Sequence, residues 1–199
     1  MKFQVNRDVL SDAVSFAVKL LPQRTTLPIL SGVLVRAENG AVTLSSFDYE
    51  VSAQTTIAAD VTEEGTILVS GRLLADIASR LPAAPVEFVT TESKIAVPCG
   101  SARFTLSSMP VEEYPSLPDV DGPSGMLPGE DFSDAVGQVA VAASRDDVTP
   151  VITGVQLEIV ENRLSLVATD RYRVAVREID WESTAVDVGV TALVPSRTL

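Results

Sequence analysis

The sequence predicts an α+β protein made of tandem copies of one fold, each with helices on a curved antiparallel sheet layer, the second copy being incomplete. An internal repeat carries this prediction, because LSSFDYEVSA at residues 44–53 and LVATDRYRVA at residues 166–175 share apolar arms around Asp48 and Asp170. The offset between these two aspartates is 170 − 48 = 122 residues. The same offset aligns further identical residues: Pro28 with Pro150, Gly32 with Gly154, and Leu44 with Leu166. A repeat of this length is the size of a domain rather than of a solenoid unit.

The first copy opens with a short strand at residues 3–5 and an amphipathic helix at residues 7–21. Asn6 is a suitable N-cap, apolar residues recur at three- and four-residue spacing, and Pro22 follows the last turn. This spacing predicts a helix with one buried face.

Alternating apolar runs then predict the rest of the first copy. We expect strands at residues 27–37, 41–47, 49–59 and 66–70, a helix at residues 72–81, and strands at residues 85–90, 94–97 and 102–107. Asn39-Gly40 predicts a tight hairpin, and Asp48 predicts a sharp corner. Gly32 predicts a bulge or a close approach, and Ser70 a cap for the second helix.

Residues 110–128 hold five prolines and two glycines, which predicts the linker between the copies. In the second copy we expect a helix at residues 130–143 and strands at residues 151–160, 163–169, 171–179 and 188–194. The predicted domains are residues 1–120 and a truncated 129–199, with 121–128 as the end of the linker. A copy that stops before its second helix would leave open sheet edges, so we expect the front part of a longer chain whose third domain is absent here.

Composition excludes several classes of function. A formal net charge of −12 argues against a protein that grips nucleic acid over its whole surface, although a local basic strip is compatible with it. The lack of histidine excludes Ser-His-Asp and Cys-His catalysis. No carboxylate group has the spacing of a known metal loop, so we expect neither metal nor cofactor. A single cysteine, Cys99, and the lack of a signal peptide or membrane span predict a cytoplasmic protein.

Four blocks of the sequence resemble one protein family: MKFQVNRDVL at the start, LPILSGVLV at 27–35, SARFTLSSMPVEEYP at 101–115 and VATDRYRVAV at 167–176. They resemble the bacterial DNA polymerase III β subunit, the replication sliding clamp. SSFDYEVSA and RDDVTPVITG are most similar to actinobacterial members. The resemblance implies three copies of one fold per subunit and two subunits joined head to tail in a ring around duplex DNA. Such a ring is a topological tether without catalysis, which is compatible with an acidic protein.

The resemblance also implies that two helices of each domain face the DNA. The basic residues on the matching elements are the candidates for this contact: Arg7, Lys19, Arg24, Arg72, Arg80, Arg145 and Arg197. Of these, Arg24 and Arg72 match DNA-facing arginines of the family. The helix expected at residues 130–143 has no basic residue, so we expect weak DNA contact from it.

A further implication is a pocket for a short motif, roughly Gln-Leu-x-Leu-Phe, carried by polymerases, the clamp loader and repair proteins. The matching positions are Ile152, Thr169, Arg171, Tyr172, Arg173 and Val174. Arg171-Tyr172 replaces the Gly-His of some members, which predicts an altered peptide preference.

The residues that match the ring interface of the family are Arg103, Phe104, Thr105 and Leu106. Ordinary core alternation explains Phe104 and Leu106 equally well, so their role stays open. Two other functions also stay open: a peptide-binding module that does not bind DNA, and a carboxylate-dependent hydrolase.

Overall fold

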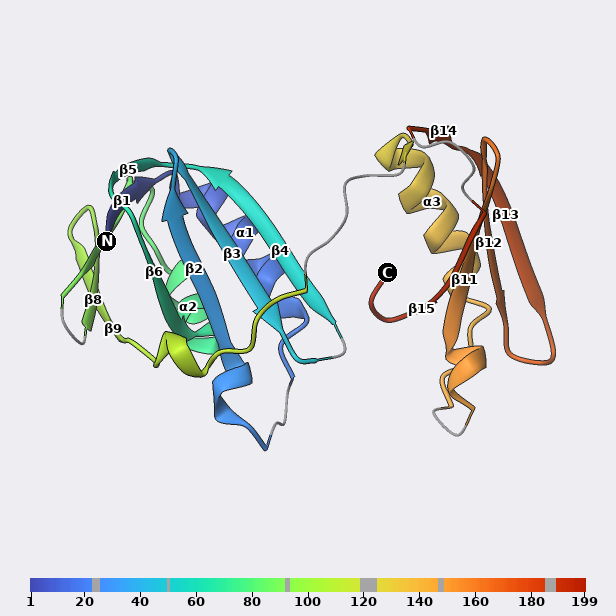
Figure 1. Cartoon of the computed structure of the whole chain (residues 1–199), viewed down its shortest axis with the longest axis horizontal. Coiled ribbons are helices and arrows are strands. Elements are labelled where there is room, and N and C mark those ends of the chain that lie inside the picture. Colours follow the sequence, from blue (N-terminus) through green and yellow to red (C-terminus); the bar gives the residue numbers. More distant parts are fainter. Residues whose placement is uncertain (23–25, 50, 92–93, 119–124, 147–148, 185–188) are drawn as a thin grey trace. The chain divides into compact units, whose positions relative to one another are not determined.

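The computed structural model describes residues 1–22, 26–49, 51–91, 94–118, 125–146, 149–184 and 189–199. The chain forms two compact units, Met1–Asp119 and Val120–Leu199 (Figure 1). Both units combine helix with antiparallel sheet, which confirms the predicted α+β class. Within the described residues, no helix is both long enough and apolar enough to cross a membrane.

In unit 1, the helices α1 (Arg7–Lys19) and α2 (Gly71–Ala78) pack against two antiparallel sheets (Figure 1). The first sheet has the order β5 (Asp60–Glu63), β1 (Lys2–Val5), β7 (Val86–Thr90), β8 (Lys94–Cys99) and β9 (Ala102–Ser107). The second has the order β4 (Ser52–Ala58), β3 (Ala41–Phe47), β2 (Gly32–Glu38) and β6 (Gly65–Ser70).

Helix α1 forms close to its predicted bounds because its sequence satisfies one end and one face. The Asn6 side chain accepts hydrogen bonds from the backbone N–H groups of Asp8 and Val9 at 2.8 and 3.3 Å, which confirms the predicted N-cap. The buried face of the helix consists of Leu10, Ala13, Val14 and Ala17. At the far end, the Ser46 hydroxyl of β3 donates to the Ala17 carbonyl at 2.7 Å. The helix is therefore held on the second sheet by apolar packing and by a hydrogen bond.

Two predictions about glycine are confirmed. Asn39 and Gly40 have φ values of 51° and 74°, as a two-residue hairpin between β2 and β3 requires. Gly32 is a site of close approach, because a Cβ atom there would lie 2.7 Å from Cδ1 of Leu68.

Some expected boundaries in unit 1 are wrong. The strand expected from residue 27 begins only at Gly32, because η1 (Pro28–Ser31) is a 3-10 turn with proline at its first position. β5 was not predicted. Ser70 precedes α2, but its side chain makes no capping hydrogen bond. α2 is also shorter than the expected 72–81.

The stretch predicted as a linker begins as an ordered part of unit 1. Residues 109–118, which we call the strap, follow β9 and include the short 3-10 helix η2 (Val111–Glu113). At its first residue, the Met109 N–H group donates to the Leu68 carbonyl of β6 at 2.8 Å. This hydrogen bond attaches the beginning of the strap to the edge of the second sheet.

Tyr114 anchors the strap. Its hydroxyl accepts from the Phe47 N–H group at 2.9 Å and donates to the Gly32 carbonyl at 3.3 Å. Burial of the ring raises the pKa of this phenol above 10.0. The linker prediction is therefore wrong for this part of the 110–128 stretch.

In unit 2, helix α3 (Gly129–Ala140) packs against a four-stranded antiparallel sheet (Figure 1). The order in this sheet is β13 (Val174–Asp180), β12 (Arg163–Thr169), β11 (Gly154–Val160) and β15 (Val190–Pro195). Two short strands, β10 (Gly125–Met126) and β14 (Glu182–Ser183), form a separate pair. The core includes Ala135, Val139, Val155, Leu164 and Leu166.

Unit 2 repeats the local conformations of unit 1, including the departures from prediction. The 3-10 turn η3 (Pro150–Thr153) again replaces the start of an expected strand, here 151–160. The corner residues Tyr49 and Arg171 both have positive φ, at 73° and 79°. β13 begins at Val174 rather than at the expected residue 171, because residues 171–173 belong to this corner.

Candidate functional site

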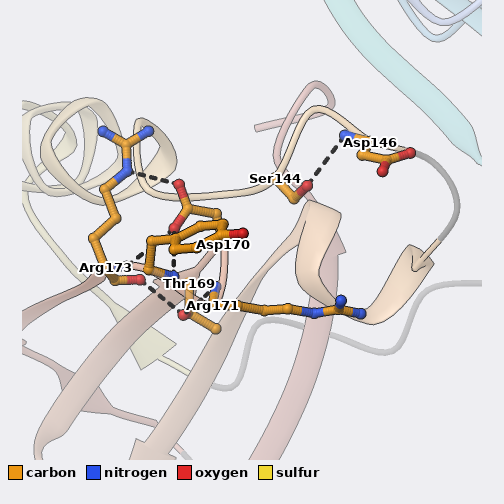
Figure 2. A network of polar contacts seen from close by, with 7 residues as sticks. Ser144, Asp146, Thr169, Asp170, Arg171 and Arg173 are labelled. Carbon is orange, nitrogen blue, oxygen red and sulfur yellow. Dashed lines mark hydrogen bonds and ion pairs between the residues drawn. The ribbon is translucent and has the colours of Figure 1, made fainter.

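The corner between β12 and β13, residues 169–173, contains most of the predicted site (Figure 2). Oδ1 of Asp170 accepts from the N–H groups of Tyr172 and Arg173 at 3.1 and 3.0 Å. Its Oδ2 accepts from Nε of Arg173 at 2.9 Å. The aspartate thus holds the corner closed, as its turn propensity predicts.

The charge of Asp170 is stabilised at this corner. Desolvation raises the pKa of its carboxyl group. Hydrogen bonds from the N–H group of Tyr172 and from the side chain and backbone of Arg173 lower this pKa by more than desolvation raises it. The net effect is a pKa below 3.8, so the corner carries an ionised Asp–Arg pair at neutral pH.

Thr169 and Arg171 connect the corner to its surroundings. The Thr169 hydroxyl donates to the Arg173 carbonyl at 2.8 Å and accepts from the Arg171 N–H group at 3.2 Å. Nη2 of Arg171 donates to Oγ1 of Thr149, directly before η3, at 2.8 Å. Figure 2 shows the two guanidinium groups pointing to opposite sides, that of Arg173 toward Asp170 and that of Arg171 away from it.

An apolar surface adjoins the corner. Tyr172 is 97% exposed, and Val174 and Val176 of β13 are 65% and 59% exposed. Strand pairing places Val174 opposite Thr169 and Val176 opposite Val167, on the face of the sheet away from buried Leu166. The site therefore combines apolar side chains with arginine and threonine at its rim, which suits a partner with apolar anchors and a polar end.

The structure brings the predicted pocket residues together. Five of them form the corner and the start of β13. Ile152 lies in η3, which packs against β11 and β12, and its N–H group bonds to the Thr149 carbonyl at 3.1 Å. The sequence prediction missed Thr149, which has no local signal, and Val176, which the alternation Val174-x-Val176 could have indicated.

Four of the predicted DNA-facing residues, Arg7, Lys19, Arg72 and Arg80, lie on or beside the two helices of unit 1. Lys19 in the last turn of α1 and Arg72 in the first turn of α2 are exposed. These ends are adjacent, since a Cβ atom on Gly71 would overlap the side chain of Leu21. Arg7 and Arg80 are each ion-paired, with Asp8 at 3.1 Å and Asp76 at 4.0 Å. Lys19 and Arg72 are therefore two exposed basic residues at adjacent helix ends.

The remaining basic candidates are Arg24, Arg145 and Arg197. In unit 2, Arg145 after α3 and Arg197 after β15 are both exposed. Arg24 lies outside the described residues. Helix α3 begins with Glu130 and Asp131, so its first turn is acidic.

The predicted interface strand, β9, is an edge strand of its sheet. Arg103 and Thr105 are exposed, whereas Leu106 is 2% exposed and belongs to the core of unit 1. Phe104 packs partly buried against the same core. An added strand would therefore meet the backbone edge and the two polar side chains before either apolar one.

Cavities and carboxylates offer little for catalysis. One cavity of unit 1, about 710 Å³, is lined by Asp8 and Asp60 together with Arg7. Asp8 is ion-paired with Arg7 at 3.1 Å. The cavity therefore does not present two unpaired carboxylates to a substrate. Among the described residues, no three His, Cys, Asp or Glu side chains are grouped to hold a metal ion.

Comparison with known proteins gives a consistent family. Residues 1–118 match the model of the DNA polymerase III beta subunit, N-terminal domain, and residues 126–199 match that of its central domain. The beta sliding clamp of Streptomyces coelicolor is 54% identical over 199 residues, covering 100% of this chain and 53% of the relative. That of Micrococcus luteus is 48% identical, covering 100% of this chain and 64% of the relative.

Solved structures agree with these matches. A DNA polymerase sliding clamp from Bacillus subtilis superposes with a TM-score of 0.88 at 26% identity, covering 99% of this chain and 54% of that one. A sliding clamp from Pseudomonas aeruginosa bound to griselimycin gives 0.88 at 28% identity, again covering 99% and 54%. The chain spans about half the length of these structures.

Proposed function

The chain belongs to the DNA polymerase III β subunit family, and we propose that it is the front part of a DNA sliding clamp. Residues 1–120 form the first clamp domain and residues 129–199 a truncated second one. In the complete protein, two subunits form a ring around duplex DNA in the cytoplasm and tether the polymerase without catalysis. The observation that carries this proposal is the match to two consecutive domains of one family over nearly the whole chain.

The DNA contact is proposed for the basic residues of the helices, chiefly Lys19 and Arg72. They are exposed at adjacent helix ends, whereas Arg7 and Arg80 are held in ion pairs. Arg24, Arg145 and Arg197 are secondary candidates. Such contacts bind phosphate without reading sequence, as a sliding protein requires.

The test uses nicked circular DNA and the chain continued beyond Leu199 with the corresponding residues of the Streptomyces coelicolor relative. Once loaded, the protein should stay on circular DNA and be released when the DNA is linearised. Retention after linearisation would exclude topological binding.

Charge reversal identifies the contact residues. Lys19→Glu with Arg72→Glu should weaken DNA binding at low salt and reduce the slope of log affinity against log salt by about 2, since each lost phosphate contact removes about one unit. Arg36→Glu with Arg163→Glu is the matched control, because it changes the net charge by the same amount at two exposed side chains that are not candidate DNA contacts. An equal loss in the control would assign the effect to net charge.

The peptide site is proposed for Ile152, Thr169, Arg171, Tyr172, Arg173 and Val174. Its support is the exposed apolar surface beside a corner fixed by hydrogen bonds. The partners would be the polymerase, the clamp loader and repair proteins that carry a motif like Gln-Leu-x-Leu-Phe. Griselimycin, bound by the Pseudomonas aeruginosa clamp, is a second probe for this surface.

A labelled peptide with this motif tests the site by fluorescence anisotropy. In the continued chain, Tyr172→Ala should reduce its affinity by about tenfold, the loss of one good anchor. Tyr49→Ala is the control, since Tyr49 is exposed at the equivalent corner of unit 1. Equal affinity of wild type and Tyr172→Ala would remove Tyr172 from the site.

The ring interface is proposed for β9, through backbone pairing at its free edge with Arg103 and Thr105 beside it. Phe104 and Leu106 would support the strand from within the core of unit 1. A proline at position 105 should therefore prevent dimerisation of the continued chain, whereas Thr105→Ala should not.

The other two functions lead to different results. A peptide-binding module that does not bind DNA would lose all function in Tyr172→Ala and none in Arg72→Ala. A hydrolase would need two carboxylates in one cavity, such as Asp8 and Asp60, so a loss of activity in Asp8→Asn would be required.

A further inference from the structure

The two arginines at the corner between β12 and β13 differ in how their charges are compensated. Nε of Arg173 is ion-paired with Oδ2 of Asp170 at 2.9 Å. Arg171 instead donates from Nη2 to the hydroxyl oxygen of Thr149 at 2.8 Å, and this partner is neutral. Within the part of the chain that the structure describes, no carboxylate forms an ion pair with Arg171. Among those residues, the corner therefore carries one positive charge without a counter-ion.

The shape of the corner does not require this charge. Arg171 has a φ of 79°, a left-handed conformation that glycine adopts without strain and most other residues adopt at a cost. Its contact with Thr169 is made by the backbone N–H group, which glycine would also supply. In the corner of unit 1 the same position is held by Tyr49, which has a φ of 73° and no charge. A side chain in such a backbone conformation suggests a role outside the turn itself.

The guanidinium group of Arg171 is placed to bind a second partner. The side chain is exposed, and Figure 2 shows it extending away from Asp170. The bond to Thr149 uses one of its five N–H donors and fixes its direction. Its other side-chain donors form no hydrogen bond to any described residue. A guanidinium group presents such donors in a planar fork, which fits the two oxygens of a carboxylate.

The neighbouring side chains indicate what kind of molecule would carry this carboxylate. Tyr172 is 97% exposed and Val174 is 65% exposed. Apolar side chains of a peptide would cover these two residues, whereas a phosphate backbone would leave them in water. The Asp170–Arg173 pair beside them is neutral as a whole, so Arg171 supplies the net charge of the corner.

We propose that Arg171 selects partners whose peptide carries an aspartate or glutamate side chain beside its apolar anchors. This inference rests on the proposed peptide site and adds a charge requirement to it. The guanidinium group binds the carboxylate through two parallel hydrogen bonds, while the apolar anchors cover Tyr172 and Val174. Because the guanidinium group points away from the corner, the acidic residue lies at a flank of the motif, directly before its first residue or directly after its last.

Fluorescence anisotropy with matched peptides tests this proposal in the continued chain. Each peptide contains Gln-Leu-Ser-Leu-Phe, has acetylated and amidated ends, and carries either aspartate or asparagine at one of the two flanks. At one flank, the aspartate peptide should bind the wild type about threefold more tightly or better at low salt, and this ratio should decrease as salt is added. A ratio near one at both flanks would overturn the proposal.

Substitutions at two arginines assign the preference to its residue. Arg171→Gln should bring the ratio close to one. Arg177→Gln should leave the ratio as in the wild type, since Arg177 is exposed on β13 but lies outside the corner. An equal loss in both variants would mean that net charge sets the preference, which would overturn the proposal. Arg171→Glu should reverse the preference, so that a peptide with lysine at the same flank binds more tightly than the asparagine peptide.

The outcomes separate this inference from the site on which it rests. If Tyr172→Ala weakens binding of the asparagine peptide but the wild type does not prefer aspartate, the peptide site stands and the charge requirement fails. If neither peptide binds, both fail. If Arg171→Gln weakens binding to duplex DNA and leaves the peptide ratio unchanged, Arg171 contacts phosphate, and the charge requirement also fails.

Discussion

Single side chains hold two segments in place: the corner between β12 and β13 and the strap of unit 1. Asp170 accepts three hydrogen bonds and so determines where Tyr172 and Arg173 lie. Tyr114 joins a strand end to a glycine carbonyl and so holds the strap on unit 1. Both act through hydrogen bonds to the backbone, which a change of one atom or one charge can remove.

Asp170→Asn should destabilise the protein in a pH-dependent manner. The pKa of Asp170 is lowered in the folded state, so its contribution is present above the unfolded pKa, near 3.8, and is lost as the pH falls through the folded value. The difference in Tm between wild type and Asp170→Asn should therefore be largest near neutral pH and vanish in acid. A difference that does not change with pH would contradict this assignment.

Tyr114→Phe should lower the free energy of unfolding of unit 1 by about 1–3 kcal/mol, because it leaves the Phe47 N–H group and the Gly32 carbonyl without this partner. Urea denaturation measures this change. The raised pKa of Tyr114 means that the wild type should lose stability as the pH rises above about 10, and the variant should lose less. Identical urea midpoints would mean that water replaces the hydroxyl.

At the scale of elements, glycine is tolerated for two different reasons. Gly137 lies on the exposed side of α3, and a Cβ atom there would meet nothing within 4 Å. Gly125 of β10 lies against the ring of Trp181, which a Cβ atom would overlap. One glycine is a weak point of a helix, and the other is required by packing.

Gly137→Ala should therefore stabilise unit 2 by about 1 kcal/mol, the difference in helix propensity. Gly125→Ala should destabilise it by about 1–3 kcal/mol, because the rigid indole ring must move. Trp181 is the single tryptophan, so its fluorescence reports both changes. The reverse order of stabilities would show that α3 and the β10–β14 pair do not pack as described.

At the scale of the whole molecule, the two units differ in how completely they are covered. Unit 1 has two helices, two sheets and a strap around one core. In the residues that the structure describes, unit 2 has one α-helix on a four-stranded sheet and a separate two-stranded pair, and its exposed side chains include Val174, Val190 and Leu193. Less buried apolar area means a smaller hydrophobic contribution to stability.

The 199-residue chain should therefore unfold in two steps, with unit 2 first. Trp181 lies in unit 2, so its fluorescence should change at a lower temperature than the last part of the far-UV circular dichroism signal. Coincident transitions would indicate that the two units unfold as one cooperative body.

Local sequence determined the elements whose signals lie within a few residues. The cap at Asn6, the Asn39-Gly40 hairpin and the corner at Asp170 follow from residues that act on their own backbone. The α+β class follows from the spacing of apolar residues along the chain. The repeat added the tandem order. Residue spacing alone did not show the 3-10 turns at Pro28 and Pro150, because an apolar run before a strand is compatible with either conformation.

The tertiary structure decided which surfaces are covered. The sequence presents Leu68 and Leu193 as equivalent strand residues, yet one is enclosed and the other is half exposed. Leu68 accepts a backbone hydrogen bond from Met109, and Tyr114 bonds to Gly32 beside it and to Phe47, all of them far away in the sequence. Burial is a sum over neighbours that only the folded chain brings together, so no local pattern could have distinguished the two leucines.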